Sequence, residues 1–478
     1  MKNNKNKEKS FSTINSKSFI SVVIVLIAIL AVSGILTLCI PQGSFLRDAN
    51  GQIIAGTFTK GSIKGIAFWR IITAPFRVFF AEGSTTIVMI SLFLLIMSGV
   101  FNLLDKTNGI KIMMNKMVNK FGNKKRLVIC VCVLFFMLFG SLFGLFEELV
   151  TLLPFMIMFM LSLGFDTMTG LGVCLLAACF GFSAAITNPF SVGIASSFAG
   201  ISALSGAWLR IVFFVLVYGL VCFFLLRYTK KIADKPNLSL SYESDNQKRK
   251  SLDLTIAEVS KQDNKIFKVY LTFFIVEFII LASVALIRPI SGYAVPILAA
   301  TFLIGGIIAG ILVVDDKKQV FAYIGKGALS MLPAVLLIAL ASSVNLVMQE
   351  SGILDTIMHY VISFLQGKNI FVSILLIYAL ILILQVFIGS ASAKIFLVMP
   401  ILLPICSVIG ISPTLLILVY CIADGFSDVL LPTNPVLLIS LSMANVSYGK
   451  WVKWTWKIQL AVFALSLLVL FFGVQIGF

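Results

Sequence analysis

The sequence has few charged residues and almost no histidine. Asp, Glu, Lys and Arg make up 12% of the 478 residues, hydrophobic residues make up 59%, and His359 is the single histidine. Soluble domains carry about twice this charged fraction, and any metalloenzyme that needs a cluster of histidines is excluded. The composition predicts an integral membrane protein.

Acidic residues are scarce as well, with 20 Asp or Glu against 37 Lys or Arg and a formal net charge of +17. In a soluble protein this balance would indicate a nucleic-acid partner. Here the basic residues lie at the ends of apolar segments, where they set membrane orientation, so we expect a lipid bilayer and no nucleic acid. The eight cysteines show no metal-ligand spacing, and we expect no cofactor and no disulfide.

One long polar stretch divides the chain. Residues 227–268 contain ten Lys or Arg and six Asp or Glu, which predicts a cytoplasmic linker between a first transmembrane repeat, 1–226, and a second, 269–478, preceded by one extra helix. The basic N-terminus and the apolar run over 18–40 predict a first membrane helix with its N-terminus in the cytoplasm. A signal peptide is disfavoured because the run is too long and no small-residue cleavage site follows.

A short motif recurs in the two halves. Gly-Phe-Ser at 181–183 precedes Thr187-Asn188-Pro189, and Gly-Phe-Ser at 425–427 precedes Thr433-Asn434-Pro435; Gly181 and Gly425 are 244 positions apart, and Pro189 and Pro435 are 246 apart. Further pairs occur in the same order at similar offsets: Asn102 with Asn345, Gly140-Ser141 with Gly389-Ser390, and Pro154 with Pro404. This shared order indicates an internal repeat.

Charge predicts that the two repeats are inverted. The loop over 103–126 has seven Lys or Arg against one acid and should be cytoplasmic. Its counterpart after Asn345 should lie outside, since it has Glu350, Asp355, His359 and Lys368. The extra helix, expected over about 269–288, adds one crossing and so turns the second repeat over. Inverted repeats with interrupted helices are typical of secondary transporters.

Each Thr-Asn-Pro motif interrupts an apolar segment. Proline in a membrane helix frees carbonyl groups, which persist in hydrocarbon only where protein, water or an ion satisfies them. The alternative is an ordinary proline kink. Because side-chain oxygens precede proline in both halves, we expect substrate or ion binding, with Na⁺ at Asn188 and Asn434, by Thr187, Asn188, Thr433 and Asn434.

Two apolar segments, 127–165 and 369–410, have small residues near the middle. From Leu127 to Gly140 a helix of about 14 residues reaches only about 21 Å, short of the roughly 30 Å hydrocarbon core. This favours a re-entrant hairpin in each half. Two full helices joined at the surface are the alternative, with Glu147 and Glu148 in a solvated turn.

Ionisable residues inside apolar segments need a reason. The repeats contain four acids and one base: Glu147, Glu148, Asp424, Asp428 and Lys394. The excess of negative charge suits a site for Na⁺, protons or a cationic group. Lys394 either pairs with an acid or a substrate carboxylate, or extends to the membrane surface. Asp424 and Asp428 are four apart on one helix face, and the alternative for them is water-lined polar packing.

These motifs resemble the C4-dicarboxylate anaerobic carrier family, in particular its YfcC-like branch, within the ion transporter superfamily. The resemblance is carried by residues 40–45, 140–148, 181–189, 389–394, 424–435 and 448–451. It implies an all-α polytopic membrane protein with two inverted-topology repeats, each with a re-entrant hairpin and a broken helix, an elevator-like movement and often a homodimer. It places the hairpin tips at Ser141, Glu147 and Glu148 and at Ser390, Ser392 and Lys394, and the broken helices at Thr187, Asn188, Thr433 and Asn434.

Asp428 departs from the resemblance, because asparagine is more usual there. An added anion disfavours a dianionic substrate, and members of this branch are also described as basic amino-acid exchangers. We expect a secondary active transporter of a small charged metabolite in a prokaryotic plasma membrane, working by alternating access and coupled to Na⁺ or H⁺. The substrate is either a C4-dicarboxylate that enters with cations or a basic amino acid such as arginine exchanged for ornithine.

Two other classes are weaker interpretations. A channel, or a membrane subunit of an ion-translocating complex, needs a continuous pore or a large docking surface, and interrupted helices argue against a pore. An intramembrane hydrolase needs a catalytic pair such as Ser390 or Ser392 with Lys394. We expect no enzymatic activity.

Overall fold

The computed structural model describes residues 16–46, 54, 56–61, 66–81, 84–113, 116, 124–252, 261–286, 294–365 and 367–478. The basic residues before 16, most of the lysine-rich loop over 114–123 and the linker residues 253–260 lie outside these ranges, and of Glu148 and Ser392 only the backbone is described. The regular structure in the described ranges is helical, apart from one antiparallel pair of short strands, β1 (Gly43–Ser44) and β2 (Thr59–Lys60).

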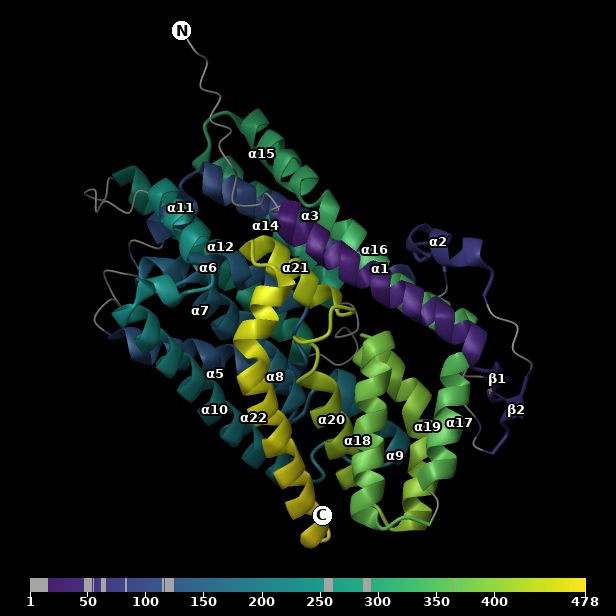
Figure 1. Ribbon diagram of the computed structural model, residues 1–478. Coiled ribbons are helices and arrows are strands. Elements are labelled where there is room, and N and C mark those ends of the chain that lie inside the picture. The colour runs from purple at the N-terminus through teal and green to yellow at the C-terminus, as the bar shows by residue number, and fades with distance from the viewer. Residues whose placement is uncertain are drawn as a thin grey trace.

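The first half is a series of helices in which short pieces follow long ones (Figure 1). After the expected first helix, the helical structure is interrupted at 144–147 and at 184–188. In chain order they are α1 (Ser16–Cys39), α2 (Phe68–Arg77), α3 (Ser84–Lys106), α5 (Lys125–Phe143), η2 (Glu148–Leu152), α6 (Leu153–Ser162), α7 (Thr167–Leu171), η3 (Gly172–Leu176), α8 (Ala177–Ser183), η4 (Pro189–Gly193), α9 (Ile194–Ala199) and α10 (Ala207–Asp234).

The second half has interruptions at the corresponding motifs, at 388–390 and at 426–434. Two short linker helices, η5 (Pro236–Leu238) and α11 (Tyr242–Leu252), precede it. Its elements are α12 (Lys261–Leu286), α14 (Ala294–Val313), α15 (Lys317–Ser330), α16 (Leu332–Glu350), α17 (Ile353–Leu365), α18 (Ile370–Phe387), α19 (Ala391–Ile409), α20 (Pro413–Gly425), α21 (Pro435–Ala444) and α22 (Tyr448–Gln475).

Length and composition allow six helices of the described chain to cross a membrane, in α3, α5, α10, α14, α18 and α22. A seventh span is formed if α15 and α16, which bend by 42° at their junction, are counted together. With the apolar composition, this makes the chain a polytopic, nearly all-helical integral membrane protein.

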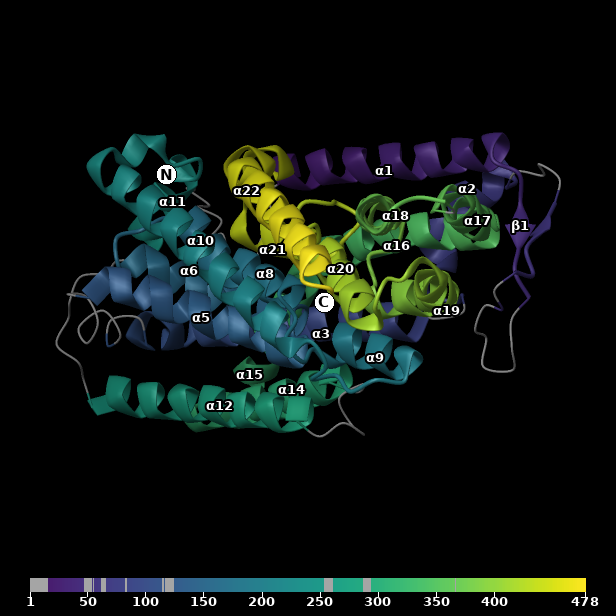
Figure 2. The same cartoon turned by 90° about the horizontal axis from the view of Figure 1, so that it is seen from below.

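The short helices lie at the centre of the molecule. Figure 2 shows α8, α20 and α21 between α1 on one side and α12 and α14 on the other. Among the outer helices, α3 packs against both α14 and α15, and α1 packs against α16. Helix α5 contacts α8, and α18 contacts α20. The interrupted segments are therefore enclosed by longer helices, where freed backbone groups can be satisfied by protein.

The first arm of the expected hairpin is longer than the sequence interpretation assumed. Helix α5 has 19 residues rather than about 14 and ends at Gly144, whose φ of +69° lies in the left-handed region that favours glycine. At 1.5 Å per residue it reaches about 28 Å, close to the thickness of the hydrocarbon core. Length therefore no longer separates a re-entrant hairpin from two full crossings.

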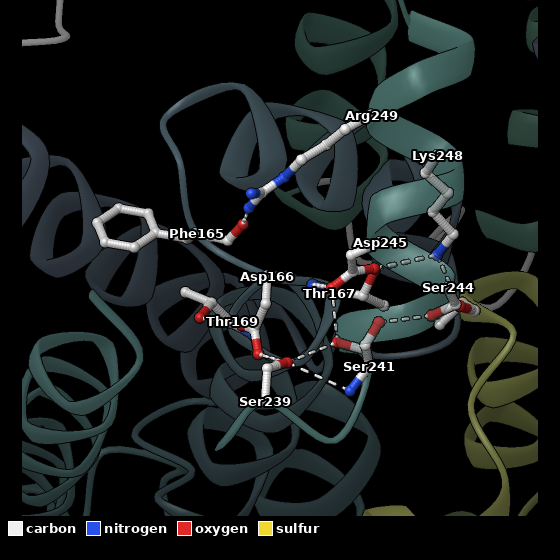
Figure 3. Close-up of polar contacts among 11 residues, drawn as sticks. Phe165, Asp166, Thr167, Thr169, Ser239, Ser241, Ser244, Asp245, Lys248 and Arg249 are labelled. Carbon is white, nitrogen blue, oxygen red and sulfur yellow. Dashed lines mark hydrogen bonds and ion pairs between the residues drawn. The ribbon is translucent and has the colours of Figure 1, made fainter. Parts of the chain in front are cut away.

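The polar linker is folded onto the first half (Figure 3). Asp166 caps α7 by accepting the Thr169 N–H at 2.8 Å and is also the acceptor for the Ser239 hydroxyl at 2.6 Å. Asp245 on α11 accepts the Thr167 N–H at 2.9 Å. Asp166 is thus an N-cap as well as an anchor for the linker.

Lys248 on α11 joins the two halves at this end. Its Nζ donates to the Thr167 hydroxyl at 3.0 Å and to the Ala444 carbonyl at the end of α21 at 2.9 Å. The start of the first broken segment and the end of the second are consequently fixed to one linker helix.

Candidate functional site

The break between α8 and η4 is held by the end of α5. The Ser141 carbonyl accepts the N–H groups of Ile186, Thr187 and Asn188 at 3.0, 3.3 and 3.1 Å, and its hydroxyl donates to the Ala184 carbonyl at 2.5 Å. The Thr187 hydroxyl donates to the Leu142 carbonyl at 2.9 Å. The interrupted backbone therefore finds its partners inside the protein, as hydrocarbon requires.

Both Asn-Pro pairs start a helix. Asn188 Oδ1 accepts the N–H of Phe190 at 2.9 Å, and Asn434 Oδ1 accepts the N–H of Val436 at 2.9 Å. Asparagine is a favoured N-cap and proline suits the first helical position, which explains the dipeptide in local terms. Each amide oxygen thus already has a backbone partner, and binding of Na⁺ by Asn188 and Asn434 stays a prediction.

Lys394 forms a buried ion pair with Asp424. Lys394 Nζ contacts Asp424 Oδ1, and the side chains are 0% and 1% exposed. The structure therefore selects pairing over extension of the lysine to the membrane surface. The residues come from separate elements, since Lys394 lies in the first turn of α19 and Asp424 at the end of α20.

Asp428 lies in the second break and is held by two amides. Its Oδ1 accepts Asn434 Nδ2 at 2.8 Å and also Gln385 Nε2. The Thr433 hydroxyl donates to the Gln385 carbonyl at 3.4 Å. Four residues predicted for the site thus lie in one short segment next to the ion pair of Lys394. They are Asp424, Asp428, Thr433 and Asn434.

Gln385 was not predicted from the sequence. It lies in the last turn of α18, is 0% exposed, and leaves Oε1 without a hydrogen-bond partner among the described residues. The available signal was its polarity, because the rest of the last two turns of this helix is almost entirely aliphatic. A polar side chain one turn before Gly389-Ser390 could have been read as part of the site.

The two broken segments cross closely at a glycine. A Cβ added to Gly425 on α20 would lie 2.3 Å from the Ser183 Cα on α8, so the backbones meet where no side chain fits. Cys179 Sγ donates to the Gly425 carbonyl at 2.9 Å, and the Ser183 hydroxyl donates to the Ile422 carbonyl at 3.1 Å. Both Gly-Phe-Ser motifs thus contribute to the same crossing.

Further contacts connect the first break with the charged cluster. Helix η4, which Asn188 caps, contacts both α19 and α20. Glu147, which is half-buried, lies in the interruption before η2. Asn188 is 0% exposed, and its Nδ2 has no hydrogen-bond partner within the described ranges. A buried unpaired donor at this point is a candidate contact for a ligand.

Three predicted residues remain at the margin of this site. Ser390 caps α19, with its hydroxyl accepting the Ala393 N–H at 3.4 Å. Ser392 follows in the first turn of the same helix and Glu148 begins η2, but their side chains lie outside the described part of the structure. Glu277, the isolated acid of the extra helix, accepts the Thr301 hydroxyl on α14 at 2.9 Å and lies away from the charged cluster.

Comparison with known proteins identifies the family. The family model of the C4-dicarboxylate anaerobic carriers matches residues 19–475. The chain belongs to this family. The match covers all residues of the candidate site, so the protein is a membrane transporter, and the family predicted from the motifs is confirmed.

Two relatives and two solved structures are similar to the chain. A Haemophilus influenzae protein without an assigned function is 30% identical over 78% of this chain and 72% of its own length. Escherichia coli YfcC, named as a candidate basic amino acid antiporter, is 26% identical over 77% and 74%. This similarity supports the assignment of the chain to the YfcC-like branch of the family.

The structures are the Alcanivorax borkumensis YdaH transporter, with 17% identity over 96% of this chain and 98% of its own, and Neisseria gonorrhoeae MtrF, described with a class of antimetabolite efflux pumps, with 16% identity over 94% of each chain. Both have a TM-score of 0.43.

Proposed function

We propose that this protein is a secondary active transporter whose site accepts a small metabolite with a positively charged group, such as a basic amino acid. The ion pair of Lys394 with Asp424 carries this proposal. Because Lys394 is already paired with Asp424, Asp428 has no ion pair within the described residues. Two amide donors stabilise the charged form of that carboxylate, so a cationic group of the substrate, Na⁺ or a proton is the natural complement.

The other end of an amino acid fits the remaining groups. Asn188 Nδ2 is a buried unpaired donor, and helices α19 and α21 begin at the two breaks of the second half, where helix N-termini favour an anion. A substrate carboxylate would bind there while Asp428 binds the cationic group. The same donors also support the second candidate, a C4-dicarboxylate, provided that Na⁺ or H⁺ enters with it and neutralises Asp428.

We further propose the inverted arrangement of the two repeats and a re-entrant form of both hairpins, in a plasma membrane with the N-terminus in the cytoplasm. The support is the reversal of loop charge and the recurrence of an interrupted helix after Gly-Phe-Ser in each half. Alternating access would then consist of movement of the broken central segments relative to the longer outer helices, and the linker contact through Lys248 would move with the centre.

An uptake assay tests the proposed site and substrate. Purified protein in vesicles is given labelled arginine or labelled succinate, with and without a Na⁺ gradient and with ornithine inside. We expect arginine uptake that depends on internal ornithine. Uptake of succinate with Na⁺, and none of arginine, would replace the proposal with the dicarboxylate candidate.

Variants in the same vesicles test individual residues. Asp428→Asn keeps the shape and removes the charge, and we expect uptake to fall roughly tenfold to 100-fold, the range for a hydrogen bond to a charged group. Asn188→Ala should abolish uptake, and Asn188→Ser, which keeps a capping oxygen but not the amide nitrogen, should abolish it too. Glu277→Gln is the matched control for a buried acid outside the site. Near-normal uptake by both Asp428→Asn and Asn188→Ala would remove the site.

Cysteine labelling tests the topology independently. Lys111→Cys and Lys368→Cys place a reactive thiol in the two corresponding loops. We expect a membrane-impermeant reagent to label Lys368→Cys from outside intact cells and Lys111→Cys only after the membrane is opened. Labelling of both from the same face would contradict the inverted arrangement.

A further inference from the structure

A basic groove lies apart from the transport site, where the C-terminal half of α10 meets the start of α22 and the linker helix η5. We define it by its four cations, Arg227, Lys231, Lys453 and Lys457. Its cavity volume is about 890 Å³, enough for a substantial ligand. The candidate site does not use any of these side chains.

The cations are arranged in two pairs. Arg227 and Lys231 are four residues apart on α10, and Lys453 and Lys457 are four apart on α22, so each pair shares a helix face. Asp and Glu are absent from the described residues that line the groove, and within the described ranges none of the four cations forms an ion pair. Four unneutralised positive charges facing one cavity indicate an anionic ligand.

The rest of the groove wall is apolar and aromatic. Phe223 is 61% exposed and Trp456 is 47% exposed, although both are large hydrophobic side chains. Trp454 is buried beneath them, with its ring centroid 4.9 Å from that of Phe224 and 5.2 Å from that of Tyr228. An acyl chain would pack against these side chains, whereas a soluble anion would contact only the cations.

The position along the helices matches the surface of a bilayer. Helix α10 changes from apolar to basic at Arg227, and α22 changes from basic to apolar after Lys457. The two helices contact each other and run in opposite directions, since Trp208 near the start of α10 packs against Phe478 at the end of the chain. Both changes therefore occur at the same level, with Phe223 on the hydrocarbon side of the four cations and Trp454 and Trp456 at the level of the cations themselves.

We infer that the basic groove binds an anionic phospholipid. The phosphate of the headgroup lies among the four cations, and an acyl chain lies along Phe223 and Trp456. Basic pockets between helices at the cytoplasmic surface have the chemistry for such headgroups. A zwitterionic lipid would gain little from the cations, because its own ammonium group would be repelled by them.

Tryptophan quenching in nanodiscs tests the inference with the full-length protein. Two of the five tryptophans, Trp454 and Trp456, line the groove, so a lipid with brominated acyl chains quenches their fluorescence when it binds there. Brominated phosphatidylglycerol is titrated into phosphatidylcholine discs, and brominated phosphatidylcholine is the reference. We expect phosphatidylglycerol to quench at a lower mole fraction, and the preference to weaken as NaCl is raised.

A pair of double variants provides the control. Lys231→Gln with Lys457→Gln removes two groove cations and should weaken the phosphatidylglycerol preference roughly 30-fold, since each cation near a membrane surface contributes about fivefold. Lys230→Gln with Lys450→Gln removes the same charge from the same helices outside the groove and should leave the preference unchanged. Size-exclusion chromatography confirms that each variant is folded.

Three results would overturn the inference. Equal losses in both double variants would mean a diffuse surface attraction, and no loss in either would mean that the groove holds no anionic lipid. Displacement of phosphatidylglycerol by an excess of inorganic phosphate, at constant ionic strength, would identify a site for a soluble anion instead.

Discussion

The buried ion pair between Lys394 and Asp424 allows a quantitative test of how the site is built. Lys394→Met removes the positive charge and keeps an unbranched apolar chain of similar length. It leaves two buried carboxylates, Asp424 at the end of α20 and Asp428 in the break that follows, rather than on one helix face as the sequence predicted, with exposed fractions of 1% and 4%. The variant Asp424→Leu removes the other partner.

The two single variants should be strongly and unequally destabilised. Breaking a buried ion pair by removing one partner costs about 3–5 kcal/mol, against a total stability of about 5–15 kcal/mol for a typical protein. We expect Lys394→Met to cost more than Asp424→Leu, because Lys394→Met leaves two buried carboxylates, whereas Asp424→Leu leaves one carboxylate and one ammonium group. In the double variant two apolar side chains face each other, and replacing both partners of a buried pair is often neutral.

Chemical denaturation in detergent, followed by tryptophan fluorescence, measures these free energies of unfolding. The double variant should be at least about 2 kcal/mol more stable than either single variant, a sign of direct coupling. In vesicles it should still fail to transport, because folding is restored but the charges of the site are not. Single variants within about 1 kcal/mol of the wild type, with additive effects, would refute a buried pair. Full transport by the double variant would show that the pair serves only stability.

Two further predictions concern packing and the linker. Gly425→Ala places a methyl group 2.3 Å from the backbone of α8 and should destabilise the protein by about 1–3 kcal/mol. The control is Gly219→Ala in the middle of α10, where the added methyl group meets nothing within 4 Å and should stabilise the protein by under about 1 kcal/mol. Equal effects of the two substitutions on the free energy of unfolding would contradict the close crossing. Burial raises the pKa of Asp166 above its usual value despite the hydrogen bonds donated by Ser239 and Thr169. The folded state therefore holds this proton more tightly than the unfolded state. The contribution of protonated Asp166 to the free energy of unfolding is therefore complete below about pH 4 and is lost as the pH rises through the raised pKa. The difference in Tm between the wild type and Asp166→Asn should accordingly shrink as the pH rises from about 4 toward neutral. A difference in Tm that stays constant over this range would contradict a raised pKa of Asp166.

The local sequence predicted where helices are interrupted better than it predicted what the residues at the interruptions bind. The Thr-Asn-Pro motifs did mark interrupted helices, because proline cannot continue a hydrogen-bonded helix. The asparagine oxygens that suggested ion ligands accept backbone N–H groups instead, a role that depends only on the neighbouring residues and could have been predicted. Helix length does not require a re-entrant hairpin, because α5 continues past Gly140 to a glycine cap at Gly144.

The sequence by itself determined the class of protein, the recurrence of its motifs and the excess of acids over bases within the apolar segments. Composition and the recurrence of motifs are properties of the chain alone, and hydrocarbon allows few ways to satisfy the polar groups of the backbone. Only the tertiary structure decided which charges meet. Lys394 and Asp424 are 30 positions apart and on different helices, and Gln385 reaches Asp428 from a third. Such pairings depend on how α18, α19 and α20 pack in space, and no periodicity within one helix encodes a partner on another.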